Sequence, residues 1–259
     1  MFNVTPRQLA TFHQASLSGF EEQMVERWEE LSPGLAAALG PERLVTALRA
    51  SIARAAAHGF TLRGPVGLFI ELRVLLGSAF DADVQYPWAR DCLARSAETR
   101  AVGSDLEQMD CAAVLHAASI EALSEIQGPD GGHVAAALGR LLDLAKEQLP
   151  AEAFDLPALA LAAMEHVHPE KAAFVGAAAL RELIAAGTAE ATRHGLSEPR
   201  DVLLIIGLMF AYGQACTTDP LLPWIGATLA DEATPTPTLR ARELEEAALI
   251  AAGDALADA

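Results

Sequence analysis

The chain contains 259 residues, of which 52% are apolar and only 5% aromatic, and its formal net charge is −17. This length is enough for one large domain or two smaller domains with a buried core. The excess of acidic residues disfavours binding to nucleic acid or to an anionic membrane, because both are polyanions that attract lysine and arginine. A basic protein partner is favoured instead. Abundant alanine and scarce aromatic residues favour close-packed helices over sheets.

The N-terminal segment from Met1 to Pro6 lacks the basic and apolar regions of a secretory signal, so we expect a cytoplasmic protein. The longest apolar run, from Val202 to Ala211, has about half the length of a membrane span and is interpreted as a buried helix. The three cysteines have no metal-binding spacing and are expected to be reduced and buried: Cys92, Cys111 and Cys216.

Helix signals run along the whole chain, and proline marks most of the expected helix starts. Thr5 before Pro6 predicts a first helix that ends near residue 31. Alternation of apolar and polar residues, the pattern of a half-buried strand, is absent over any useful length. The sequence therefore predicts an all-α fold, a multi-helix bundle. Further helices are expected over residues 41–58, 66–79, 106–126, 170–194, 199–214 and 239–256, with short helices that begin at Pro87 and Pro223.

The second half of the chain repeats the first after 136 positions, without a gap over the best-matched stretch of 36 positions. Such self-similarity indicates two diverged copies of one helical unit. We expect one copy over residues 1–128 and the other over 133–259, closely packed together. The breaker cluster from Gly128 to Gly132 marks the junction. The clearest matched pairs are His58-Gly59 with His194-Gly195, Gly77 with Gly213, Asp83 with Asp219, and Pro87-Trp88 with Pro223-Trp224.

The repeated His-Gly pair has a structural interpretation and a functional one. His58 and His194 are each expected in the last turn of a helix, where a partial positive charge suits the helix dipole. Gly59 and Gly195 then take the left-handed conformation that ends a helix. The alternative is that the two histidines form halves of a symmetric metal or acid/base site. We favour the structural interpretation because local physics explains both residues.

The repeated Pro-Trp pair is also interpreted as structural. Pro87 and Pro223 are expected at the first helical position, where they fix the helix entry. Trp88 and Trp224 are expected to be buried in equivalent pockets between helices. The rival interpretation is a ligand-stacking or partner-binding tryptophan.

Two other groups of residues resemble known sites. Asp81-Ala82-Asp83 is similar to the start of a calcium loop, but the turn glycine and the closing glutamate are missing, so we expect capping or loop hydrogen bonds. His166 and His168, beside Pro169, form the sharpest enzyme-like cluster, although side chains two positions apart on a helix point about 200° apart. No nucleophile elbow or phosphate-binding glycine loop is present. We therefore expect no catalytic, cofactor-binding or metal-binding residues.

The runs from His58 to Leu93 and from His194 to Leu229 resemble a family of bacterial accessory proteins found with contractile injection systems, type VI secretion in particular. The resemblance covers roughly half of the chain, and the duplication departs from the family's single-unit pattern. It implies a non-enzymatic protein encoded with secreted toxins, which acts as an immunity protein or as an adaptor for an effector.

These observations predict an acidic, cytoplasmic protein-binding protein without a cofactor. Its expected partner is a basic toxin or secretion component encoded nearby, which would bind acidic helix faces and an apolar groove between the copies. One alternative is a metal-dependent hydrolase that uses His166 and His168. Another is a structural scaffold or dimerisation module. The sequence does not indicate an oligomeric state.

Overall fold

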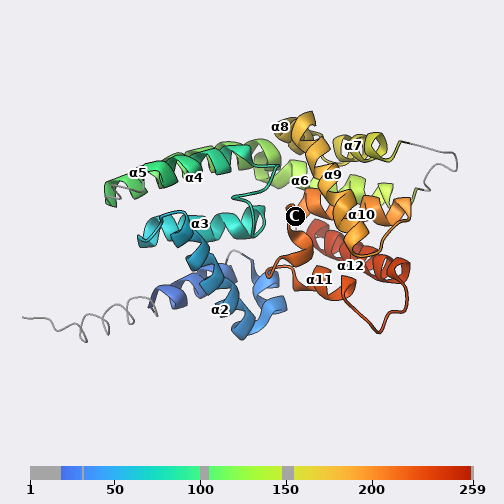
Figure 1. The fold of residues 1–259 in the computed structure, drawn as a ribbon, viewed down its shortest axis with the longest axis horizontal. Helices are drawn as coiled ribbons and strands as arrows, with labels where there is room; N and C mark the ends of the chain where they lie inside the picture. Colours follow the sequence, from blue (N-terminus) through green and yellow to red (C-terminus); the bar gives the residue numbers. More distant parts are fainter. Residues whose placement is uncertain (1–18, 31, 100–104, 148–154, 258–259) are drawn as a thin grey trace, which may run out of the picture. The chain divides into compact units, whose positions relative to one another are not determined.

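The computed structural model describes residues 19–30, 32–99, 105–147 and 155–257, and throughout these ranges it contains helices and no strand (Figure 1). The all-α class is thereby confirmed. Residues 19–30 are helical. The other α-helices are α2 (Pro33–Ala57), α3 (Arg63–Leu76), α4 (Pro87–Thr99), α5 (Asp105–Gln127), α6 (Gly132–Leu144), α7 (Leu156–Val167), α8 (Pro169–Val175), α9 (Ala177–Arg193), α10 (Pro199–Tyr212), α11 (Pro223–Leu229) and α12 (Pro237–Ala257).

One expected helix is divided in the structure, and glycines mark both this break and an expected helix start. The single helix expected over 170–194 is divided into α8 and α9 by Gly176, whose φ is +81°. The helix start expected at Pro41 is confirmed within the span of α2, because Gly40, with φ +70° and ψ 165°, interrupts the helix immediately before Pro41. Positive φ interrupts a right-handed helix, and glycine adopts it without strain. The Thr5-Pro6 helix start lies outside the described residues.

By internal contacts the chain divides into two compact units. Unit 1 comprises Met1–Leu75 and Ala94–Ala112, and unit 2 comprises Leu76–Leu93 and Ala113–Ala259. The segment from Leu76 to Leu93 therefore packs with residues of the C-terminal half. The expected boundaries at residues 128 and 133 describe sequence similarity rather than packing, and they stay a prediction.

The core of unit 1 is formed by apolar side chains that recur at helical spacing. Trp28, on the helix over residues 19–30, is completely buried. On α2 and α3 the buried stripes follow i, i+3 and i+4 spacing, which is the pattern of helices with one face in a core. They consist of Leu44, Ala47, Leu48 and Ala55 on α2 and of Val66, Phe69, Ile70 and Leu72 on α3.

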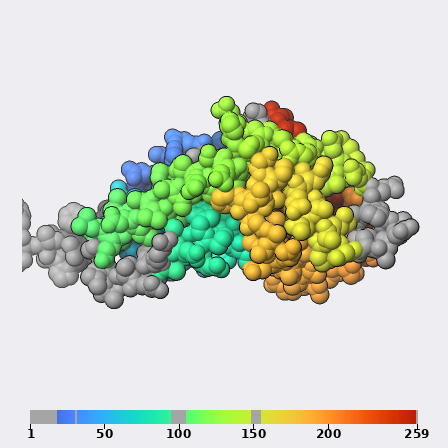
Figure 2. Space-filling view, turned by 90° about the horizontal axis from the view of Figure 1, so that it is seen from above, coloured from blue at the N-terminus to red at the C-terminus, as the bar shows by residue number. Residues whose placement is uncertain are grey.

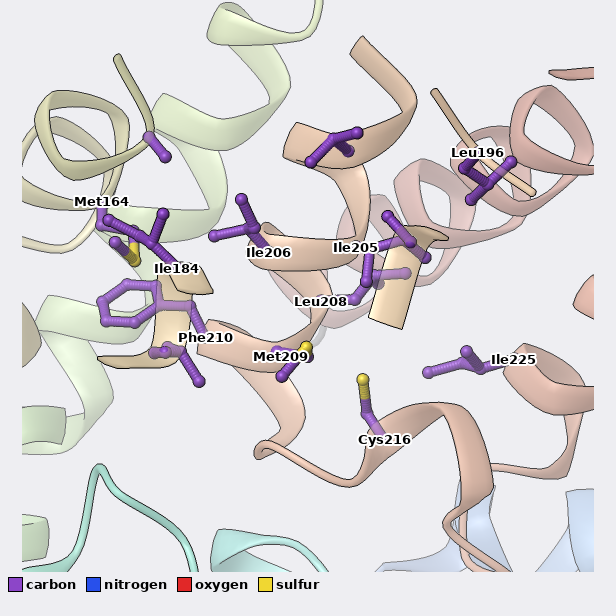
Figure 3. Close-up of a cluster of buried hydrophobic side chains, with 14 of the residues drawn as sticks. Met164, Ile184, Leu196, Ile205, Ile206, Leu208, Met209, Phe210, Cys216 and Ile225 are labelled. Atoms are coloured by element: carbon purple, nitrogen blue, oxygen red, sulfur yellow. The ribbon is translucent and has the colours of Figure 1, made fainter. Parts of the chain in front are cut away.

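The core of unit 2 is centred on α9 and α10, whose apolar side chains interleave (Figure 3). Gly187 lets the two helices approach closely, because a Cβ atom there would lie 2.7 Å from Cγ1 of Ile206. Met164 of α7 and Ile225 of α11 complete the cluster around Ile184 and Met209. The expectation that the apolar run at 202–211 forms a buried helix is confirmed.

Candidate functional site

The most ordered group of polar residues lies where two loops meet inside unit 2. One loop follows α3 and begins at Gly77, and the other follows α10 and begins at Gly213. The φ angles of these glycines are +98° and +100°. A Cβ atom on Gly77 would lie 2.5 Å from the carbonyl oxygen of Tyr212, and one on Gly213 would lie 3.0 Å from that of Leu76. The two backbones therefore touch at a point where only glycine fits.

Two buried aspartates join the loops by a reciprocal exchange of hydrogen bonds. Asp83 Oδ2 accepts from the backbone N–H of Gln214 at 2.6 Å. Asp219 Oδ2 accepts from the backbone N–H of Ser78 at 2.8 Å. Each carboxylate thus binds the residue that follows the glycine of the opposite loop. The expected loop hydrogen bonds of Asp83 are thereby confirmed.

Each aspartate also stabilises its own loop. Asp83 Oδ1 accepts from the N–H of Gln85 at 2.9 Å, and Asp219 Oδ1 accepts from the N–H of Leu221 at 2.8 Å. These are bonds to the backbone two residues on, the Asx turn that aspartate favours. The carboxylates therefore pair buried N–H groups that would otherwise cost about 1–3 kcal/mol each.

A buried lysine lies next to the first loop. Lys171 of α8 is 5% exposed, and its Nζ donates to the carbonyl oxygen of Phe210. The Nζ atom also lies 5.0 Å from the ring centroid of Phe210 and 5.9 Å from that of Tyr86, within range of cation–π attraction. Carbonyl and aromatic faces thus replace much of the water that the ammonium group loses.

Burial shifts the pKa values of the ionisable side chains around the first loop. It lowers the pKa of Lys171 to about 8, although the carboxylate of Asp83 opposes the shift. Burial raises the pKa of Asp83, against the effect of the N–H donors from Gln214 and Gln85 and of the Lys171 charge. Burial also raises the pKa of Tyr86, which keeps its phenol neutral. Loss of hydration disfavours whichever form is charged.

A second buried polar cluster surrounds Glu190 on α9. The hydroxyl of Thr217 donates to Glu190 Oε1, and Nε2 of His194 lies 3.1 Å from the same oxygen. Arg193 pairs with the other carboxylate oxygen. Burial, reinforced by the charges of Arg193 and Arg240, lowers the pKa of His194. Glu190 therefore links the end of α9 to the loop that carries Asp219.

The repeated His-Gly pairs end their helices as expected. His58 and His194 have identical backbone angles, φ −88° and ψ 5°. Gly59 and Gly195 have positive φ. After each glycine the next residue donates its N–H to a carbonyl five residues back, Phe60 to Ala55 and Leu196 to Ala191, which is the Schellman motif. Burial and the nearby charges of Arg193 and Arg240 lower the pKa of His194, which opposes the partial positive charge expected there.

The expected burial of Trp88 and Trp224 is wrong, since both side chains are only partly buried. Pro87 and Pro223 do begin helices, so this part of the prediction is confirmed. The ring of Trp88 packs edge-on against Tyr86, and that of Trp224 against Tyr212, each with centroids 6.3 Å apart. The next residues, Ala89 and Ile225, are the fully buried ones. A short helix can bury only one side, and here that side lies one position after tryptophan.

His166 and His168 are not brought together. His166 is exposed, while His168 is buried and its Nε2 lies 2.9 Å from the carbonyl oxygen of Ile126. Burial lowers the pKa of His168. Within the described ranges, no three residues of the types His, Cys, Asp or Glu are placed to hold a metal ion.

The expectation of three buried cysteines is only partly confirmed. Cys92 and Cys216 are buried, but Cys111 is partly exposed. All three are free thiols. Burial raises the pKa of Cys216 to about 12, which keeps it protonated and unreactive.

Sequence reasoning missed Lys171 and Glu190. Each is a charged residue on a helix, a pattern typical of an exposed position. Neither is matched by a similar residue 136 positions earlier. One available signal is that Lys171 is one of only two lysines in the chain. Their burial depends on the loops that fold over them, and spacing along the sequence does not report it.

Comparison with family models, with curated proteins and with solved structures finds no match for this chain. In the described ranges, no single helix is both long and apolar enough to cross a membrane. The pair α8 and α9 reaches the required length and composition only together, and a bend of 100° separates the two helices.

Proposed function

We propose that this protein is a non-enzymatic, acidic, protein-binding protein of the cytoplasm. The observation that carries the proposal is the use of the repeated polar groups inside the molecule. Asp83 and Asp219 bind backbone N–H groups, and the two His-Gly pairs end helices. Residues that are fully engaged in holding the backbone are poorly suited to acid/base or nucleophilic chemistry on a bound substrate.

We further propose that the chain arose as two tandem copies of one helical unit. The bonds of Asp83 to Gln214 and of Asp219 to Ser78 support this, because a shift of 136 positions turns the acceptor and donor of one bond into those of the other. Similar backbone angles at matched positions also support it. Gly40 and Gly176 share a kink, and Ser32 and His168 precede matched helix starts with φ −148° and −137°.

Charge supports a basic protein as the partner. With 35 acidic and 18 basic residues, the chain attracts cationic surfaces and repels polyanions. The resemblance to accessory proteins of type VI secretion suggests a secreted toxin or a secretion component encoded nearby. In that setting the protein serves either as an immunity protein that blocks an effector or as an adaptor that escorts one.

Co-expression of the tagged protein with each product of the neighbouring genes tests this function. We expect one basic product to bind in fixed stoichiometry and to dissociate as salt rises, because exposed charges are screened over about 8–10 Å at 0.1–0.15 M salt. Inhibition of that product's toxicity in the complex indicates an immunity protein, and retained toxicity indicates an adaptor.

Two results would contradict the proposal. A stoichiometric transition metal that is lost in the His166→Ala and His168→Ala double variant would favour the metal-dependent hydrolase. Failure of every neighbouring product to bind at low salt would leave the structural scaffold or dimerisation module. Elemental analysis of the purified protein and the co-expression series together separate these alternatives.

A further inference from the structure

Helix α5 has two apolar stripes, of which one is buried and the other is exposed among the described residues. The buried stripe follows the spacing of a helix face against a core: Ala112, Leu115, Ser119, Ala122 and Ile126. Four of the eight large apolar side chains that are exposed in the described residues also lie on this helix: Leu106, Met109, Val114 and Ile120. Exposed groups of this kind on one element mark an interaction surface more often than isolated ones do.

The second stripe consists of Leu106, Met109, Ala113, Ala117 and Ile120, all of them exposed. At 100° per residue it lies about 140° around the helix from the buried stripe. Leu106, Ala113 and Ile120 are seven positions apart, and Met109 completes the spacing by which one helix packs along another. The stripe spans about 21 Å, nearly four helical turns. Figure 2 shows part of the surface of α5 in green.

The charge next to this stripe has one sign. Helix α5 contains five acidic residues and no lysine or arginine: Asp105, Glu107, Asp110, Glu121 and Glu125. Asp110 and Glu121 are exposed and lie along one edge of the stripe. By contrast, α12 carries Arg240 and Arg242 among its acidic residues. A partner that covers the stripe on α5 must therefore combine apolar anchors with flanking positive charge.

We propose that the stripe on α5 is a docking surface for a basic amphipathic helix of a partner protein. The apolar residues of the partner helix, at i, i+3 and i+7 spacing, pack between Leu106, Met109 and Ile120. The lysines or arginines of the partner helix pair with Asp110 and Glu121. This is the helix-recognition mode in which apolar anchors supply affinity and charge supplies register. The inference rests on the proposed function, because it names the surface at which a basic partner binds.

Charge also argues against the other occupants of such a face. A second copy of this chain would place the acidic edge of one α5 against that of another, and like charges across a helix interface are unfavourable. Nucleic acid and anionic membranes are repelled by the same carboxylates. A cationic apolar helix gains from both features at once.

A designed peptide provides the direct test. The probe is a fluorescent 21-residue helix with leucines at heptad spacing and flanking lysines, and its binding to the full chain is followed by anisotropy at low salt. We expect saturable binding to the wild type. We expect at least tenfold weaker binding of two control peptides, one with glutamate in place of lysine and one with the same composition in scrambled order.

Variants of the protein place the binding on α5. The triple variant Leu106→Gln, Met109→Gln and Ile120→Gln is expected to weaken probe binding at least tenfold, since glutamine keeps helix propensity but removes the anchors. The double variant Leu239→Gln and Ile250→Gln, at exposed apolar positions of α12, is the matched control and is expected to bind like the wild type. Circular dichroism and melting temperature check that both variants fold.

Several outcomes would overturn the docking surface. These are equal binding by the triple variant, equal binding of the acidic peptide, no binding of the probe at low salt, or a dimer of the wild type that dissociates in the triple variant. The last outcome would assign the stripe to a second copy. A neighbouring gene product that binds the triple variant as tightly as the wild type would remove the α5 surface but keep the proposed function. If the probe bound through α5 but no neighbouring gene product bound the protein, the α5 surface would be kept and the proposed function would be contradicted.

Discussion

The two loops that meet in unit 2 have the same backbone but different surroundings. In the first loop Phe80 donates its N–H to the carbonyl of Gly77, and in the second Cys216 donates to Gly213. Asp83 and Asp219 each accept one N–H bond from their own loop and one from the opposite loop. The first loop has a buried lysine and the side chain of Gln85 next to Asp83, whereas the second loop is bonded through Thr217 to the buried Glu190.

This difference separates what the loop requires from what it tolerates. Glycine and aspartate are needed at fixed positions because the turn and the close approach leave no other choice. The side chains around them can differ, provided that they fill the space between the loops and that their buried polar atoms form hydrogen bonds. Gln85 in one loop and Leu221 in the other occupy matched, buried positions, and the first donates through Nε2 to Asp83 and to the Met209 carbonyl.

Replacement of the loop glycines is expected to have the largest effect. Gly77→Ala should lower the free energy of unfolding by about 3–5 kcal/mol, because strain at positive φ adds to an overlap with a carbonyl oxygen. Gly213→Ala should cost about 2–3 kcal/mol, since its Cβ has more room. Urea unfolding measures both, with Gly207→Ala in α10 as a control that meets nothing within 4 Å. An equal or larger loss for Gly213→Ala would contradict the order.

Removal of the aspartates should separate the loops next. Asp83→Ala is expected to cost about 3–4 kcal/mol and Asp219→Ala about 2 kcal/mol, because only the first leaves a buried cation without its counter-charge. In a Lys171→Met background the cost of Asp83→Ala should fall, while that of Asp219→Ala should not change. A double-mutant cycle by chemical denaturation gives the coupling. No coupling between Asp83 and Lys171 would show that their charges do not interact.

Alkaline pH should reveal the buried lysine. Its pKa is about 8 in the folded protein against an ordinary 10.5, so between these values the unfolded chain binds more protons and stability rises with pH. We expect a gain of about 3 kcal/mol across this window in the wild type relative to Lys171→Met. The control is Lys146→Met, which changes the other lysine, an exposed one. Parallel pH profiles for wild type and Lys171→Met would contradict the lowered pKa.

Loss of the paired tryptophans should have the smallest effect. Trp88→Ala and Trp224→Ala are each expected to cost about 1–2 kcal/mol, as half-buried rings in contact with a tyrosine. Trp28→Ala, which removes a completely buried ring, should cost about 3–5 kcal/mol and serves as the reference. Thermal melts compare the three. If Trp88→Ala melted like the wild type but lost partner binding, that tryptophan would be a recognition residue.

Much of the local structure is predictable from particular residues. The Gly59 and Gly195 helix ends, the helix starts at Pro87 and Pro223, and the buried helix around 202–211 all follow from backbone restrictions and spacing. The position of Trp88 and Trp224 does not, because which side of a short helix is covered depends on its neighbours. The same holds for the break at Gly176, where a glycine within a helix expected to be continuous has positive φ.

The sequence by itself determined the helical class, most helix ends and the matched positions of the two halves, since these depend on dihedral preferences and on neighbours within a few residues. Only the tertiary structure decided that Asp83 and Asp219 exchange bonds between loops, and that Lys171 and Glu190 are buried. Those contacts join residues from 27 to 141 positions apart. Their energies depend on desolvation, which a linear pattern of residues does not record.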